Sequence, residues 1–145
     1  MGTWGHSAFE NDAASDWLAD LYDAGNIAPV EKAIRAALPE KPSLLKKLLG
    51  AKANTYLDAD VASVALVAAE VLAALRGNPH ASIPQELADF LQTHESSVSD
   101  ELYSLAIGVV SRIGIDSELC ELWQEAGEFV LWKEDLDLLV RRIVG

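Results

Sequence analysis

Four aspartates near the N-terminus are spaced so that their carboxylates could share one helix face. They stand 4, 4 and 3 residues apart, at Asp12, Asp16, Asp20 and Asp23. Like charges one turn apart destabilise a helix by about 0.2–0.5 kcal/mol per pair, so something could offset this repulsion. Side chains on a straight helix spread by about 5.4 Å per turn and do not converge on one ion without further ligands. We therefore predict no metal site and no cofactor here.

Three interpretations of this aspartate column are open. The face could be solvated, it could pair with basic residues of the same chain, or it could meet an external cation or a basic protein partner. Six of the eleven basic residues fall between positions 32 and 52, so a helix folding back could bring opposite charges together. They are Lys32, Arg35, Lys41, Lys46, Lys47 and Lys52.

A ligand or interaction site could form at this end of the chain. Such sites combine apolar walls with a few polar groups. Trp4 and Trp17 could supply the walls, while Asn11, Asp12, Asp16 and Asp20 could supply the polar groups.

A second acidic column lies in the C-terminal third. Its members are spaced 3, 4 and 3, at Glu118, Glu121, Glu125 and Glu128. The apolar residues between them are expected to face the core. This face could attract a basic partner through electrostatic steering, or it could serve solubility alone.

Glu70 stands nearly alone in an apolar stretch, and Asp60 and Ser63 could share a narrow polar strip with it. If the strip is buried, burying the Glu70 carboxylate costs free energy, and Glu70 becomes a candidate residue of a functional site. If the strip faces solvent, Glu70 only marks the outside of the helix. We favour the exposed arrangement.

No recognised catalytic motif occurs in the sequence, and we predict no catalytic residues. Nucleophile elbows, phosphate-binding glycine loops, HExxH and CxxC are all absent. His6, His80 and His94 lie far apart and are expected on the surface or in loops. Cys120 is the only cysteine, which rules out an intramolecular disulfide and fits a small buried residue in a reducing compartment.

The net charge of −12 argues against nucleic-acid and anionic-membrane partners, both of which need clustered lysine and arginine. The first residues lack the basic and apolar regions of a secretory signal. The most apolar stretch, Val61–Leu75, is too short to span a bilayer as a helix. We expect a cytoplasmic protein.

The elements that position these residues are all predicted to be helices, because no segment alternates with a period of two. Caps, prolines and glycines set the expected ranges: 12–25, 29–38, 43–50, 58–76, 82–94, 99–113, 116–127 and 128–144. Helical spacing places Trp17 in the buried face of the first of these helices, with Ala13 and Leu21, and Pro84 in the first turn of the fifth. The alanine-rich segment 58–76 is apolar almost all round and should be the central helix. Residues 1–10 should fold against the bundle through Trp4 and Phe9. We thus predict one all-α domain over 1–145, a compact bundle of about seven or eight helices.

The opening MGTWG…F-E-N-D-x-A-x-D-W…L resembles the N-terminal signature of a bacterial family described as a domain of unknown function. The matching residues are Met1, Gly2, Thr3, Trp4, Gly5, Phe9, Asn11, Asp12, Ala14, Asp16, Trp17 and Leu21. Two later stretches, Ala65–Pro79 and Ser117–Trp132, are also similar. The resemblance implies an all-helical bacterial protein and implies no activity.

Three functions are compatible with these observations. We favour a non-catalytic interaction or regulatory module, of the inhibitor or immunity kind, with a basic protein as its partner. The first alternative is an enzyme or a small-ligand or metal-binding protein with its site at the N-terminal signature. In the second alternative the signature is purely structural. The sequence predicts no oligomeric state.

Overall fold

The computed structural model describes residues 7–38, 48, 57–94 and 97–145, and seven helices lie within these ranges. In chain order they are α1 (Asp12–Ala24), α2 (Ala28–Ala36), α4 (Ala59–Leu75), α5 (Gln85–Thr93), α6 (Asp100–Ile113), α7 (Glu118–Glu125) and α8 (Phe129–Val144). The described residues contain no strand, so the all-α prediction is confirmed. The helix expected at 43–50 lies outside the described residues, apart from position 48.

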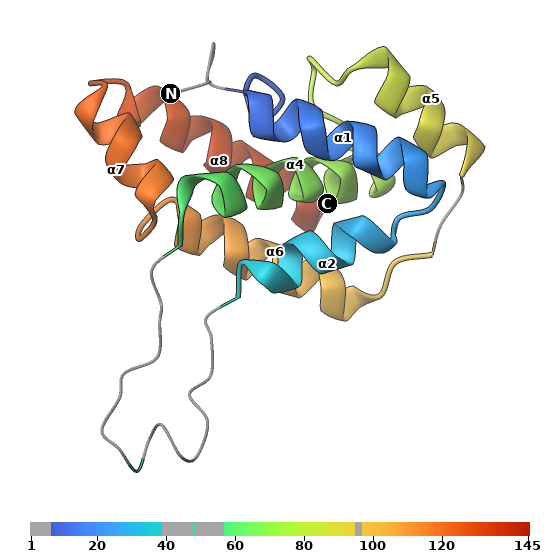
Figure 1. Ribbon diagram of the computed structural model, residues 1–145, viewed down its shortest axis with the longest axis horizontal. Coiled ribbons are helices and arrows are strands. Elements are labelled where there is room, and N and C mark those ends of the chain that lie inside the picture. Colours follow the sequence, from blue (N-terminus) through green and yellow to red (C-terminus); the bar gives the residue numbers. More distant parts are fainter. Residues whose placement is uncertain (1–6, 39–47, 49–56, 95–96) are drawn as a thin grey trace.

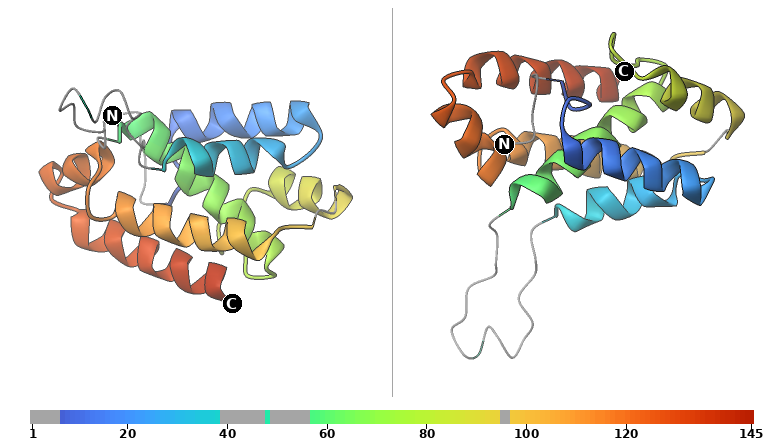
Figure 2. Two further views of the ribbon diagram at one scale, coloured as in Figure 1. Left: turned by 90° about the horizontal axis from the view of Figure 1, so that it is seen from below. Right: turned by 45° about the horizontal axis from the view of Figure 1, so that its top comes forward.

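Helix α4 is the centre of the bundle, as its alanine-rich sequence predicts. It contacts α1, α2, α6, α7 and α8. Figures 1 and 2 show α1 and α2 on one side of it, α6 and α8 on the other, and α5 and α7 at opposite ends. Eleven of its residues are buried, because small side chains on every face let its neighbours approach closely.

Polar side chains begin the helices where the sequence places caps. Asn11, Asp58, Ser99 and Ser117 each accept a hydrogen bond from a backbone N–H in the first turn of α1, α4, α6 and α7. Pro84 differs from expectation, because it precedes α5 as the capping position rather than lying inside the first turn.

Glu70 is buried, with 3% of its surface exposed, so the exposed arrangement predicted from the sequence is wrong. Its two carboxylate oxygens accept hydrogen bonds of 2.8 and 2.9 Å from the Arg142 guanidinium of α8. A bidentate pair of this kind offsets the cost of burying the carboxylate. The polar strip therefore runs from the exposed Asp60 into the protein, where α8 is fastened to α4.

Two further contacts hold the end of α8 to the end of α4. The Arg76 guanidinium lies 4.0 Å from the centre of the Tyr103 ring and donates a hydrogen bond to the Ile143 carbonyl. The Asn78 amide donates to the Arg142 carbonyl. The site candidate at Glu70 is thus explained as a structural ion pair.

No helix in the described ranges is both long and apolar enough to cross a membrane.

Candidate binding groove between α1 and α2

The turn between α1 and α2 fixes the two helices side by side. Gly25 ends α1 in the left-handed region, at φ 68°, where a Cβ would introduce strain. The Asn26 side chain then bridges the turn, since its amide donates to the Ala24 carbonyl at 3.2 Å and its oxygen accepts from the Ala28 N–H at 2.9 Å. Pro29 lies in the first turn of α2, where its missing N–H costs nothing.

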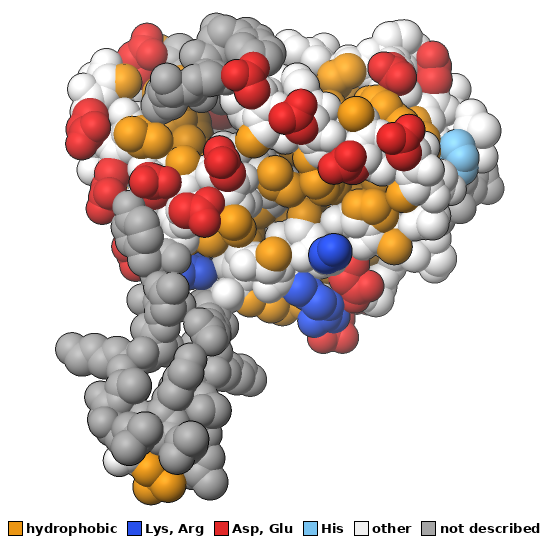
Figure 3. Space-filling view, in the orientation of Figure 1, with side chains coloured by type: hydrophobic (Ala, Val, Ile, Leu, Met, Phe, Trp, Pro, Cys, Tyr) orange, Lys and Arg blue, Asp and Glu red, His pale blue; other side chains and the backbone are white. Residues whose placement is uncertain are grey.

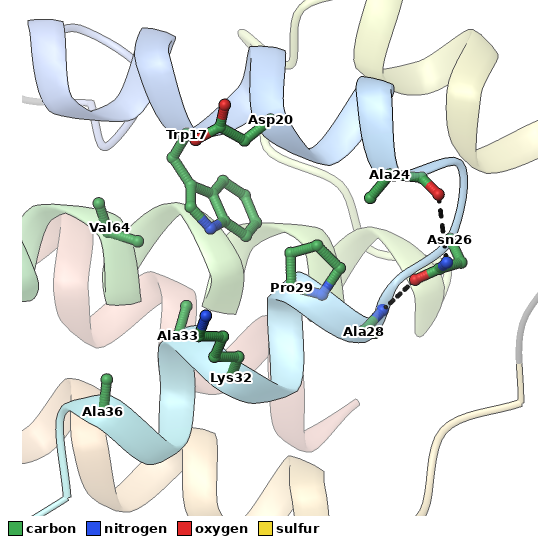
Figure 4. Close-up of a pocket in the computed structure, with 10 residues that line it drawn as sticks. All are labelled: Trp17, Asp20, Ala24, Asn26, Ala28, Pro29, Lys32, Ala33, Ala36 and Val64. Carbon is green, nitrogen blue, oxygen red and sulfur yellow. Dashed lines mark hydrogen bonds between the residues drawn. The ribbon is translucent and has the colours of Figure 1, made fainter.

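Small side chains on the facing sides of the two helices leave an open groove of about 720 Å³ (Figure 4). Its lining is mostly apolar: Trp17, Asp20, Ala24, Asn26, Ala28, Pro29, Lys32, Ala33, Ala36 and Val64. Pro29, Ala33 and Ala36 recur at helical spacing along α2, so one stripe of that helix forms a wall. Ala24, Ala28 and Ala36 are exposed, which leaves room for another molecule to approach the backbone.

Trp17 is the aromatic side chain among the lining residues of the groove. The sequence predicts it in the buried face of α1, but it is only partly buried, whereas Ala14, Leu18 and Leu21 are buried. In Figure 4 its ring extends from α1 toward α2 across the groove. Amphipathic aromatic rings of this kind are enriched where proteins bind partners.

The aspartate column forms the acidic edge of this groove. Asp12, Asp16, Asp20 and Asp23 are all exposed, and none forms an ion pair with a basic side chain in the described part of the chain. Figure 3 shows acidic side chains in a row above an apolar strip, with basic side chains on the α2 side. Of the four, only Asp20 lines the groove itself.

Helix α2 carries two basic residues, Lys32 and Arg35, of which only Lys32 lines the groove. Arg35 is engaged by acidic neighbours, at 3.0 Å from Glu31 and 3.9 Å from Glu101. Lys32 is exposed and lines the groove. Pairing between the column and these two basic residues, one of the sequence interpretations, is therefore not formed. The other four basic residues, Lys41, Lys46, Lys47 and Lys52, lie outside the described residues.

Asn11 does not belong to the groove. Its side-chain oxygen accepts from the Ala14 N–H at 2.8 Å and its amide donates to the Ala8 carbonyl at 3.2 Å, so both groups hold the entry to α1. Phe9 is buried in the core and its ring lies edge-on to His80, with centroids 6.0 Å apart. Trp4 lies outside the described residues.

The second acidic column is only partly a surface feature. The Glu118 carboxylate accepts a hydrogen bond of 2.7 Å from the Ala59 N–H, so it closes the N-terminus of α4 and is not available as predicted. Glu121, Glu125 and Glu128 are exposed on α7 and at the start of α8. None of the three lines the groove between α1 and α2.

The Cys120 thiol and the Tyr22 phenol lie outside the groove. Cys120 is buried, as expected, and burial raises the pKa of its thiol, with Glu121 and Asp116 adding to the effect. Burial also raises the pKa of the Tyr22 phenol to about 12, helped by Glu86. In the described ranges, no three His, Cys, Asp or Glu side chains are grouped so that they could hold a metal ion.

Sequence reasoning named Trp17 and Asp20 but missed α2 as the other wall. The signal was present, because Pro29, Ala33 and Ala36 form a small-residue stripe with Lys32 on its flank. Such a stripe gives close helix packing when it is covered and a groove when it is not, so the sequence alone does not distinguish the two.

Comparison with known protein families gives a match over most of the chain. A family model described as "Domain of unknown function (DUF4259)" matches residues 2–135. Neither the curated proteins nor the solved structures gave a match.

Proposed function

This chain belongs to the DUF4259 family of domains of unknown function, and we propose that it is a non-catalytic protein-interaction module that binds its partner in the α1–α2 groove. The observation that carries the proposal is the open apolar groove with the partly exposed Trp17 along it and, beside it, four exposed aspartates that form no ion pair with the described residues. Buried apolar anchors supply most of the binding energy of protein interfaces, and flanking charges supply steering and specificity. A regulatory inhibitor or immunity protein would be one form of this module.

A groove-filling substitution tests the proposal. Ala36 is exposed and lines the groove, so Ala36→Trp would place an indole in it without entering the core. Ala126, also exposed and at the end of a helix, lies away from the groove, and Ala126→Trp adds the same surface there. Both variants are to be compared with the unmodified protein as baits in the lysate of the source organism, and any captured protein is then purified and titrated.

The proposal predicts a partner that binds the unmodified protein and Ala126→Trp but loses at least about tenfold in affinity for Ala36→Trp, as expected when an interface core is blocked. Equal binding by all three proteins would overturn the groove as the site. Circular dichroism of the variants ensures that a loss of binding is not a loss of fold.

A small apolar ligand is the second candidate function, because the groove volume falls within the range of about 300–1,000 Å³ that small-molecule sites occupy. A thermal-shift screen with metabolites tests it. Stabilisation of the unmodified protein but not of Ala36→Trp would favour a ligand site, and no shift with any compound would count against one.

A further inference from the structure

We propose that the occupant of the α1–α2 groove is an amphipathic helix of a basic partner protein. Its small apolar residues would face the groove, and its lysine or arginine residues would lie along α1. This inference rests on the proposed function and adds the chemistry of the partner.

The shape of the groove fits a helix. Its walls are two helices that lie side by side, α1 with 13 residues and α2 with 9. Nine helical residues extend about 13 Å, so a bound helix of three to four turns would cover the whole wall. The alanines at positions 24, 28, 33 and 36 allow its backbone to come close, and Trp17 is placed to pack against its apolar side chains.

The charges on the two sides of the groove indicate which charges the occupant carries on each of its sides. Successive members of the aspartate column are three or four residues apart, which is a rise of about 4.5–6 Å along α1. A helix lying beside α1 with basic residues at the same intervals would match each carboxylate with a cation. On α2, Arg35 is already engaged by Glu31 and Glu101, whereas Lys32, which lines the groove, has no ion pair among the described residues. One acidic residue of the occupant would suit that position.

Electrostatics disfavour a second copy of this chain as the occupant. The chain carries a net charge of −12, and two copies meeting at this groove would bring their aspartate columns together. A basic partner is steered toward the same edge by the same charges. The repulsion within α1, which destabilises that helix in the unbound protein, would be relieved on binding.

Three synthetic helical peptides test the charge requirement. They share one alanine- and leucine-rich face. They differ only in the residues on the side of the helix next to that face, the flank, which are lysine, glutamine or glutamate. Fluorescence anisotropy of the labelled peptide measures the affinity for the full-length protein. We expect the lysine peptide to bind about tenfold more tightly than the glutamine peptide at low salt, since each exposed pair adds a modest amount, and the glutamate peptide more weakly still. Raised salt should narrow these differences.

Two charge-matched variants assign the effect to the aspartate column. Asp16→Asn/Asp20→Asn removes two carboxylates beside the groove and should abolish most of the preference for the lysine peptide. Glu125→Gln/Glu134→Gln removes two exposed carboxylates from α7 and α8 and should leave the preference unchanged. Equal loss in both double variants would overturn the proposal, because the preference would then follow net charge alone.

Ala36→Trp separates the failure of this inference from the failure of the proposed function. If the peptides bind the groove, Ala36→Trp weakens all of them. Groove-dependent binding that is the same for lysine and glutamine flanks would overturn the basic occupant and leave the groove function intact. Binding that is insensitive to Ala36→Trp would overturn both. A dimer of the unmodified protein in light scattering that Ala36→Trp dissociates would assign the groove to a second copy and overturn the basic partner.

Discussion

At the scale of single residues, the ion pair between Glu70 and Arg142 shows how an isolated charge in an apolar helix can be structural. Glu70 lies in the core helix and is matched by an arginine 72 positions later in the chain. The sequence shows the carboxylate, but it does not show which distant cation will reach it. For that reason the burial of Glu70 could not be predicted. The sequence allowed both a buried and an exposed position for its carboxylate.

Removal of the Arg142 side chain should lower the stability of the fold. Arg142→Ala leaves the buried carboxylate without its partner, and we expect the free energy of unfolding to fall by about 3 kcal/mol, at the lower end for buried pairs because Arg142 itself is partly exposed. Urea denaturation measures the change. Arg141→Ala is the control, because Arg141 is exposed and its loss should cost less than about 0.5 kcal/mol. An equal loss of unfolding free energy in the two variants would mean that the Glu70–Arg142 ion pair contributes nothing to stability.

Tyr22 should give the protein a measurable loss of stability at high pH. Its pKa is raised from 10.0 to about 12 by burial and by Glu86, so the folded state holds the phenolic proton more tightly than the unfolded state does. The stabilisation is complete below pH 10 and is lost as the pH rises through 12. Denaturation midpoints measured from pH 9 to pH 12 should fall more steeply for the unmodified protein than for Tyr22→Phe. Parallel curves would contradict the raised pKa.

At the scale of elements, most helix boundaries follow from short-range chemistry and could be predicted from sequence. Asn11, Asp58, Ser99 and Ser117 cap the helices that follow them, and Gly25 ends α1 as expected. Which face of a helix is covered depends on neighbours that are distant in sequence, and here the predictions were less accurate. Trp17 was expected in the core because its position repeats with Ala13 and Leu21, yet it borders a groove that α2 does not fill.

Helix α1 should be stabilised by removing charge from its acidic face. Asp16 has a like charge one turn before it and another one turn after it, so Asp16→Asn relieves two repulsive pairs and should raise the free energy of unfolding by about 0.4–1 kcal/mol. Chemical denaturation at low salt measures the gain. At high salt the gain should shrink, because exposed charges are screened. A loss of stability would instead mean that Asp16 has a favourable partner within the chain. We expect the same substitution to weaken binding of a basic helix.

At the scale of the whole molecule, the all-α bundle around α4 could be predicted because composition and periodicity are properties of the chain itself. The groove could not, because it is formed where residues of α1, α2 and α4 meet. The alanine stripe of α2 contributes little apolar surface of its own, and its role depends on what lies opposite. The aspartate column could be recognised from its spacing in the sequence. Its position beside the groove could be seen only in the folded structure.

The most direct test of the central claim is amide and indole chemical-shift mapping by NMR of the full-length protein titrated with the lysine-flanked helical peptide. The account predicts that the shifts concentrate on the groove, at the Trp17 indole and the amides of Ala28, Lys32 and Ala36, with further changes at Asp16 and Asp20. Residues of α7 and α8 should remain unchanged and serve as the internal control. Shifts centred on α7 or α8, or no shifts at peptide concentrations that saturate the anisotropy signal, would contradict the claim that the α1–α2 groove is the binding site.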